Sequence, residues 1–209
     1  MHSDPTRRRF LVLSAVAAAC LAASSVSSAA LDPTAARVQA FYDVLLDTMK
    51  QGPQLGVQGR FDKLLPAVQA AYDMSTMMKI ACGSNWAKIP TEEQQALIVA
   101  FERMSTAIYA DRFAKFSGQK FVVDPAPVPH NADMVVRTQL IPGNGDPVQL
   151  NYLMRGSADN MRIVDVFREG AISELATRRS EFAGVLRSDG PDALLAKLKE
   201  RADTILKGH

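Results

Sequence analysis

The sequence predicts an α+β fold, in which an antiparallel meander of about four strands packs against N-terminal and C-terminal helices. Three observations predict this arrangement. Apolar side chains recur at helical spacing up to residue 116 and again after residue 172. Between these segments, residues 121–167 alternate between apolar and polar side chains, as half-buried strands do. Short links rich in glycine, proline and asparagine join the alternating stretches, which favours neighbouring antiparallel strands.

The first 30 residues have the layout of an export signal rather than of a folded element. Arginines at positions 7–9 stand directly before an apolar run over residues 10–23, and small residues follow. Consecutive arginines before Phe-Leu resemble a twin-arginine signal. An uncleaved anchor is one alternative, but the apolar run is short for a membrane span of about 20 residues. Lipidation of Cys20 is another. We therefore expect residues 1–30 to be an export signal.

Residues 31–209 are then expected to form a single domain, and their composition argues against several kinds of function. The signal holds three of the 24 basic and one of the 22 acidic side chains, which leaves 21 of each. Nucleic-acid binding, which depends on positive charge, has little support in this balance. One cysteine remains, Cys82, so that no intramolecular disulfide is expected.

The N-terminal part of this domain is expected to be helical. A first helix over residues 33–50 ends at Gly52-Pro53, and a shorter amphipathic segment follows over residues 60–71. Asp73 is expected to cap a helix over residues 74–82. The next helix, over residues 91–116, should begin with a capping box formed by Thr91 and Gln94.

Four strands should follow, over residues 121–123, 133–141, 148–155 and 161–167. The proline-rich stretch 125–129 is predicted to be a loop, and residues 142–147 a hairpin turn. Two helices close the chain, over residues 173–186 and 191–207, with Ser173 as the N-cap of the first and Pro191 at the start of the second.

Side chains that could do chemistry are few. His130 and His209 have no neighbours at metal-ligand spacing, Cys82 has no histidine partner, and no phosphate-binding loop or hydrolase motif is present. We therefore expect no metal, no cofactor and no catalytic residue. A pocket enzyme with Asp165 as base and Tyr152 as donor is an alternative, although we favour a hydrogen-bonded structural role for Asp165.

The stretch 166–186 collects serine, glutamate and arginine side chains that resemble parts of a phosphate-binding site. Helical periodicity instead predicts that Arg178, Arg179 and Glu181 fall mainly on the outer side of a helix, as a solvated face or a docking patch. The apolar residues are unusual in containing many methionines, whose flexible thioethers suit a cavity that accepts varied chains. Ordinary core packing is the simpler interpretation of the same spacing.

The order of elements and many short motifs resemble the MlaC-type periplasmic lipid-binding proteins, soluble components of an ABC-type lipid transport system. The resemblance covers residues 35–207 and rests on Phe61-Asp62, Trp86, Pro90-Thr91-Glu92-Glu93-Gln94-Gln95, Val164-Asp165-Val166, Glu169-Gly170-Ala171-Ile172-Ser173, Arg179-Ser180-Glu181-Phe182 and Gly190-Pro191-Asp192-Ala193-Leu194. The stretches 109–113, 152–155 and 172–182 look most like the HpnM branch, which is associated with hopanoids.

This resemblance implies a periplasmic carrier, not an enzyme, whose sheet and helices enclose an apolar cavity for lipid tails and leave the head group near the mouth. The ligand would be a phospholipid or a hopanoid, exchanged with an inner-membrane transporter and an outer-membrane lipoprotein complex. Few charges are expected deep inside the cavity. The exported chain is not expected to insert stably into a membrane. The residues that would line the cavity lie on the apolar faces of the predicted helices and strands. They are Phe41, Leu45, Met77, Met78, Leu97, Phe101, Met104, Ile108, Leu150, Tyr152, Met154 and Val166. An adaptor that docks envelope proteins without any cavity is a third hypothesis.

Overall fold

The computed structural model describes residues 31–157 and 160–208. The predicted export signal, with Cys20, lies outside the described residues. The helices are α1 (Pro33–Lys50), α2 (Gly52–Ala71), α3 (Met74–Cys82), the 3₁₀ helix η1 (Gly83–Lys88), α4 (Thr91–Arg112), α5 (Glu174–Ser188) and α6 (Gly190–Lys207). The strands are β1 (Lys120–Val123), β2 (Val128–His130), β3 (Asp133–Ile141), β4 (Val148–Arg155), β5 (Arg162–Arg168) and β6 (Ile172–Ser173).

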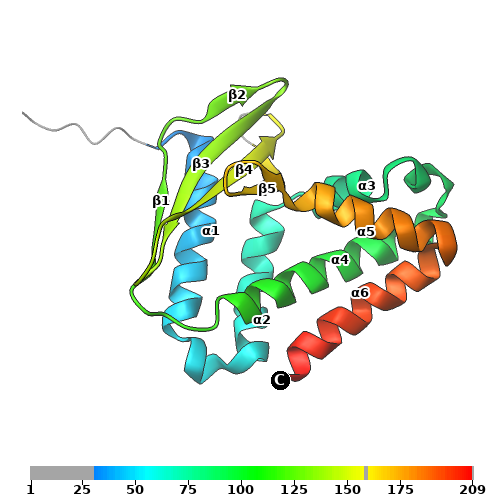
Figure 1. Cartoon of the computed structure of the whole chain (residues 1–209), viewed down its shortest axis with the longest axis horizontal. Coiled ribbons are helices and arrows are strands. Elements are labelled where there is room, and N and C mark those ends of the chain that lie inside the picture. Colours follow the sequence, from blue (N-terminus) through cyan, green and yellow to red (C-terminus); the bar gives the residue numbers. More distant parts are fainter. Residues whose placement is uncertain (1–30, 158–159, 209) are drawn as a thin grey trace, which may run out of the picture.

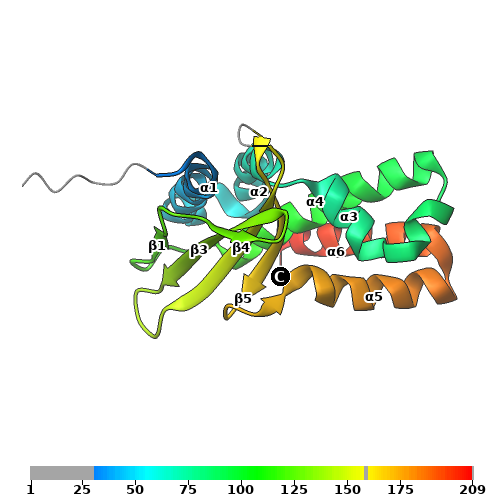
Figure 2. The ribbon, with the colours of Figure 1, turned by 90° about the horizontal axis from the view of Figure 1, so that it is seen from above.

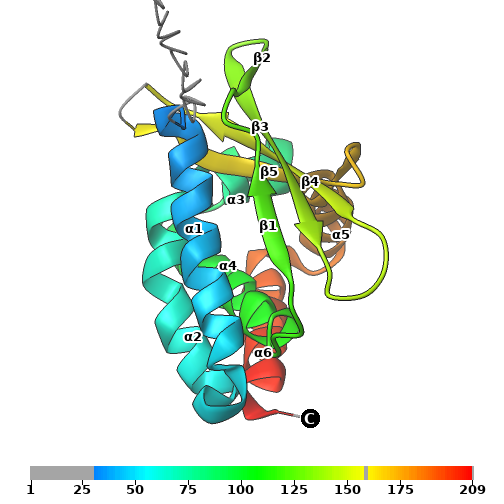
Figure 3. The ribbon, with the colours of Figure 1, turned by 90° about the vertical axis from the view of Figure 1, so that its left-hand side faces the viewer.

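The predicted α+β arrangement is confirmed. Helices α1 and α2 lie side by side next to the sheet, and α3 to α6 extend away beyond β5, with α4 packed against α2 (Figures 1 and 2). Figure 3 shows α1 running along the sheet, with which it makes contacts at β1 and β3. Within the described residues, no helix is both long enough and apolar enough to cross a membrane.

The sheet is fully antiparallel, in the order β1-β3-β4-β5-β6, with β2 pairing to the same strand β3. It therefore has two short strands beyond the four that we expected. Strand β2 falls in the predicted proline-rich loop, where Pro129 sits opposite Met134 at the edge of the sheet. Proline is tolerated at a sheet edge because its missing N–H donor is not needed there, so that the spacing of prolines concealed a strand.

The helix starts show which capping predictions hold. Asp73 Oδ1 accepts a hydrogen bond of 2.8 Å from the N–H of Thr76, and Ser173 Oγ accepts one of 2.8 Å from the N–H of Ala176. Both predicted caps are confirmed. The capping box at Thr91 is wrong, because α4 starts there and Pro90 is its N-cap residue, without a side-chain cap.

Gln94 instead reaches backward from the first turn of α4. Its Nε2 donates to the carbonyl oxygens of Trp86, at 3.0 Å, and Ile89, at 2.9 Å. The side chain thereby satisfies carbonyl groups in and after η1, and it fixes the angle between η1 and α4. The C-terminal end of α4 also differs from the prediction, since the helix stops at Arg112.

A buried arginine holds the C-terminal end of α4 against α2. Arg60 is 8% exposed and donates from Nε to the carbonyl oxygen of Ala110, at 2.6 Å, and from Nη1 to that of Gly52, at 2.9 Å. A cation at a helix C-terminus also interacts favourably with the helix dipole. Helix α2 is kinked at Gly56, whose φ of 62° is readily adopted by glycine. Helix α2 therefore has one short helical segment before Gly56 and a longer one after it, and together they begin earlier than the predicted segment 60–71.

A bidentate ion pair between the neighbouring strands β3 and β4 should make stability depend on pH. Arg155 donates to both carboxylate oxygens of Asp133, at 2.8 and 2.7 Å. These hydrogen bonds lower the pKa of Asp133 below its ordinary value. A carboxyl group with a lowered folded-state pKa contributes stability above its unfolded pKa of about 3.9, and the contribution is lost as the pH falls through the folded value.

We therefore expect Asp133→Asn to destabilise the fold at neutral pH by less than about 1 kcal/mol, since the arginine is half exposed and solvent screens the pair. The variant and the parent protein should converge in stability once the pH falls below the folded-state pKa of Asp133, which lies below the unfolded value of about 3.9. Urea denaturation at pH 7 and at acid pH measures both differences. A stability gap that is constant over this range would show that the carboxylate charge contributes nothing.

Candidate functional site

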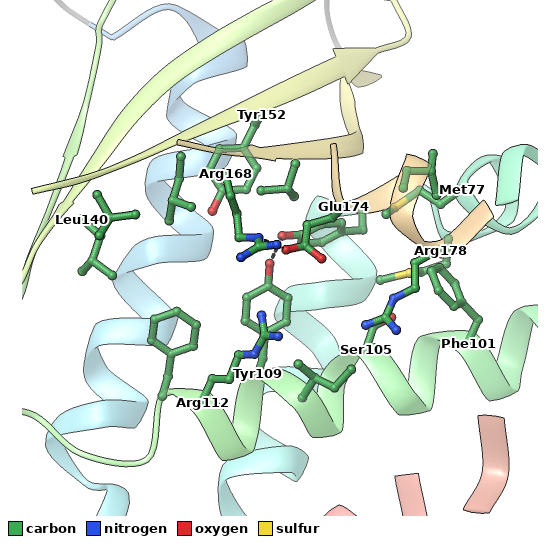
Figure 4. Close-up of a pocket in the computed structure, with 18 residues that line it drawn as sticks. Met77, Phe101, Ser105, Tyr109, Arg112, Leu140, Tyr152, Arg168, Glu174 and Arg178 are labelled. Atoms are coloured by element: carbon green, nitrogen blue, oxygen red, sulfur yellow. Dashed lines mark hydrogen bonds and ion pairs between the residues drawn. The ribbon is translucent and has the colours of Figure 1, made fainter. Parts of the chain in front are cut away.

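A cavity of about 250 Å³ lies between the sheet and α4, with α3 and α5 closing one end (Figure 4). The sheet contributes Leu140, Val148, Leu150, Tyr152, Val166 and Arg168. Helix α4 and the residue after it contribute Phe101, Ser105, Ile108, Tyr109, Arg112 and Phe113, the region of α3 contributes Tyr72, Met74 and Met77, and α5 contributes Glu174, Leu175 and Arg178.

Strand register explains how the sheet presents its lining. Tyr152 of β4 lies opposite Val166 of β5, and Leu150 lies opposite Arg168. Because side chains alternate between the two faces of a strand, these four residues point to the same face. The lining of α4 follows the helical repeat, with residues at positions 101, 105, 108 and 112 on one side.

Six of the twelve residues predicted to line the cavity do so: Met77, Phe101, Ile108, Leu150, Tyr152 and Val166. The other six belong to the packed core and not to the lining: Phe41, Leu45, Met78, Leu97, Met104 and Met154. Each of them is at most 2% exposed. Periodicity selects the apolar stripe of an element, but a stripe that packs against another helix has the same pattern as one that faces a cavity.

Because Met104 belongs to the core and not to the cavity lining, shortening its side chain should affect stability but not ligand binding. Met104→Ala should lower the free energy of unfolding by about 2–5 kcal/mol, because the thioether leaves a void in the core. Denaturant titration measures the loss. Folded molecules of the variant should still bind ligand in the cavity. A loss of ligand binding without a loss of stability would contradict the placement of Met104 in the core.

Aromatic residues form the back of the cavity. Tyr42 lies behind it, stacked on Phe121 with ring centroids 4.2 Å apart and edge-on to Tyr152 at 5.6 Å. The hydroxyl of Tyr42 is 2.6 Å from Thr138 Oγ1. In the lining itself, the hydroxyls of Tyr72 and Tyr109 are hydrogen-bonded to each other.

Burial makes these phenols poor proton donors. It raises the pKa of Tyr109 to about 12, and it also raises the pKa values of Tyr72 and Tyr152 above their ordinary range. None of the three is therefore poised to give up a proton near neutral pH.

The carboxylate of Asp165 is committed to local structure. It accepts hydrogen bonds from the N–H of Val166 at 2.7 Å, from the hydroxyl of Ser173 at 2.5 Å and from the N–H of Leu175 at 3.0 Å. Asp165 is 7% exposed and is not among the residues that line the cavity. The interpretation of Asp165 as a hydrogen-bonded structural carboxylate is confirmed. Asp165 and Tyr152 do not line a common pocket, as the pocket-enzyme alternative would require. Among residues 31–157 and 160–208, no group of histidine, cysteine and acidic side chains could hold a metal ion.

Charged residues at the cavity are what the sequence reasoning missed. Arg168 forms an ion pair with Glu174, and Arg178 contacts Glu181 at 3.3 Å. The prediction that Arg178 lies on an outer face is wrong, because α5 turns this side chain toward α4 and its exposure is only 16%. For Arg112 a signal was present, since it continues the spacing of Phe101, Ser105 and Ile108 along α4.

Comparison with known proteins finds a matching protein family and a solved structure with a similar fold. Residues 39–200 match the model of the MlaC protein family. The fold is similar to that of the phospholipid-binding protein from Ralstonia solanacearum, solved in complex with a phospholipid at 1.53 Å resolution. The TM-score is 0.70 and the identity 26%, over 82% of this chain and 98% of the Ralstonia chain. The sequence has no significant match among curated proteins.

Proposed function

Because the chain belongs to the MlaC protein family, we propose that it is a periplasmic lipid carrier that shields the acyl chains of one lipid in the cavity between the sheet and α4. The observation that carries the proposal is the cavity itself, whose lining is mainly apolar and comes from four separate parts of the fold. The similar protein from Ralstonia solanacearum, which binds a phospholipid, supports a lipid as the ligand.

Physical chemistry favours a buried site for such a ligand. An acyl chain of about 16 methylenes gains about 0.8 kcal/mol for each group taken out of water, or about 13 kcal/mol in total. A groove that left half of the chain in water would lose about half of that energy. A carrier that crosses an aqueous compartment therefore needs its cavity to surround the tails.

The cavity must enlarge to take a whole lipid. Its volume of about 250 Å³ is below the range of about 300–1,000 Å³ typical of ligand pockets. The side chains of Met74 and Met77 lie at one end of it, and unbranched thioethers adjust their shape readily. We infer that loading lengthens the cavity along α4, at the end where Met74 and Met77 can change their side-chain conformations.

The wider setting of the carrier forms part of the proposal. An export signal over residues 1–30 would deliver residues 31–209 to the periplasm as one lipid-binding domain. There the chain would exchange lipid between an inner-membrane transporter and an outer-membrane lipoprotein complex. The three stretches that look like the HpnM branch make a hopanoid a second candidate cargo beside phospholipid.

Lipid extraction tests the proposal. The exported protein is purified without detergent and extracted with organic solvent, and mass spectrometry identifies the lipid and its ratio to protein. We expect about one lipid per chain, and uptake of lipid from vesicles by protein from which the lipid has been removed. Absence of lipid from both experiments would overturn the carrier and would favour an adaptor.

A further inference from the structure

We propose that Arg112, Arg168 and Arg178 form a phosphate-binding site at the cavity, and that the protein therefore selects phospholipids whose head group carries net negative charge. The inference rests on the proposed function, because the tails of the same lipid would occupy the apolar part of the cavity. It goes further in naming the chemical class of the cargo and the side chains that recognise it.

The three arginines converge from separate elements. Arg112 ends α4, Arg168 ends β5 and Arg178 lies one turn into α5, yet all three line the same cavity. Glu174 is the acidic side chain that lines it with them, so that the charges at the cavity sum to two positive. The resemblance to the MlaC-type proteins had implied few charges deep inside.

Arg112 and Arg178 are bound less closely by carboxylates than Arg168 is. Among the residues that the structure describes, no carboxylate lies within ion-pair distance of Arg112. The carboxylate that Arg178 contacts, Glu181, is shared with Lys197, also at 3.3 Å, and neither Glu181 nor Lys197 lines the cavity. Neither arginine is therefore neutralised by an acidic side chain in the cavity.

Glu174 marks the place that an anion would take. Its carboxylate pairs with Arg168 and lies between Arg168 and Arg178 in Figure 4. Glu174 and Arg112 line the same cavity as the hydroxyl-bearing Tyr109. The N–H groups of Leu175 and Ala176, in the first turn of α5, are already bonded to Asp165 and Ser173, so that these two do not serve as anion donors.

The chemistry of guanidinium selects among lipids. Its planar set of donors matches two oxygens of a phosphate, and such charge-assisted hydrogen bonds are about twice as strong as neutral ones. A head group with an added ammonium would bring a like charge to a site that is already positive. An uncharged polycyclic lipid would leave the arginines without a partner. The expected order of preference is anionic phospholipid, then zwitterionic phospholipid, then uncharged lipid.

Mixed vesicles test the preference without interference from docking. The exported protein, freed of lipid, is incubated with vesicles of equal parts phosphatidylglycerol and phosphatidylcholine with matched acyl chains, and is re-isolated for mass spectrometry. Both lipids share one membrane, so attraction of the protein to a charged surface favours neither. We expect the bound lipid to be enriched in phosphatidylglycerol by about tenfold, the effect of one additional charge-assisted contact.

Variants assign the preference to the arginines. The double variant Arg112→Gln with Arg178→Gln should bind the two lipids in the ratio of the vesicles, whereas Arg187→Gln, on the exposed side of the same helix α5, should keep the enrichment. Glu174→Gln should increase it, because the competing carboxylate is gone. This variant keeps the inference falsifiable even if the double variant fails to fold.

The outcomes separate the two proposals. Binding by the parent protein in the vesicle ratio would overturn the phosphate site and leave the carrier in place, whereas no binding of either lipid would overturn both. Repeating the loading with inorganic phosphate in the buffer shows whether the arginines bind the phosphate of a lipid head group or a free phosphate ion. Enrichment should persist, since the buried tails hold the head group in place, and its loss would assign the arginines to free phosphate.

Discussion

Val166→Trp should reduce the lipid bound by a protein that remains folded. Val166 lies on the cavity face of β5 opposite Tyr152, and an indole ring at this position would project into a space of about 250 Å³. Exclusion of only two methylenes of an acyl chain costs about 1.6 kcal/mol, which lowers affinity more than tenfold. Tryptophan is well accommodated in strands, so that the sheet should tolerate the change.

The measurement is the ratio of lipid to protein after solvent extraction, together with a circular dichroism spectrum to establish folding. Val122→Trp is the matched control, because Val122 lies in β1, is 47% exposed and does not line the cavity. It should retain parental lipid. A folded Val166→Trp protein with a full complement of lipid would mean that the tails lie elsewhere.

Asp165→Asn should have the opposite result, a loss of stability without a specific loss of lipid. The carboxylate joins β5 to the start of α5 by accepting three hydrogen bonds, from Val166, Ser173 and Leu175. The amide oxygen can still accept from the N–H groups of Val166 and Leu175, which both bond to Oδ1, but the NH₂ group replaces the oxygen that accepts from the Ser173 hydroxyl. The negative charge that strengthens all three hydrogen bonds is lost as well, so we expect a loss of about 2–4 kcal/mol.

Thermal unfolding should show this loss as a fall in Tm of about 4–16 °C, since 1 kcal/mol corresponds to about 2–4 °C for a domain of this size. Asp62→Asn changes an exposed carboxylate of α2 and should be nearly neutral. The folded fraction of Asp165→Asn should still carry lipid. Unchanged stability would contradict the structural role and would reopen the pocket-enzyme hypothesis.

Sequence reasoning predicted the local structure well where one residue decides it. Asp73 and Ser173 were assigned as caps because a short polar side chain before an apolar helical run has few other uses. The reasoning failed where a distant neighbour decides. Gln94 bonds to carbonyl groups of η1, and β2 exists only because β3 extends past β1, so neither could be derived from adjacent residues.

The candidate site shows the same limit. Met77 and Met78 are adjacent on one apolar helix, and only the first lines the cavity. The difference depends on how α3 is rotated against β5 and α5, which tertiary packing determines. Sequence reasoning put Arg178 on the outer side of its helix, because charged side chains are ordinarily solvated.

The tyrosines of the chain make the protein an optical reporter of its own cargo. All four tyrosines lie at the cavity or directly behind it, whereas the single tryptophan, Trp86, lies in η1 and is not part of the lining. Near-ultraviolet circular dichroism of the tyrosine band should therefore change when lipid enters, while tryptophan emission stays nearly constant. Transfer between membranes could then be followed in real time with neither protein nor lipid labelled.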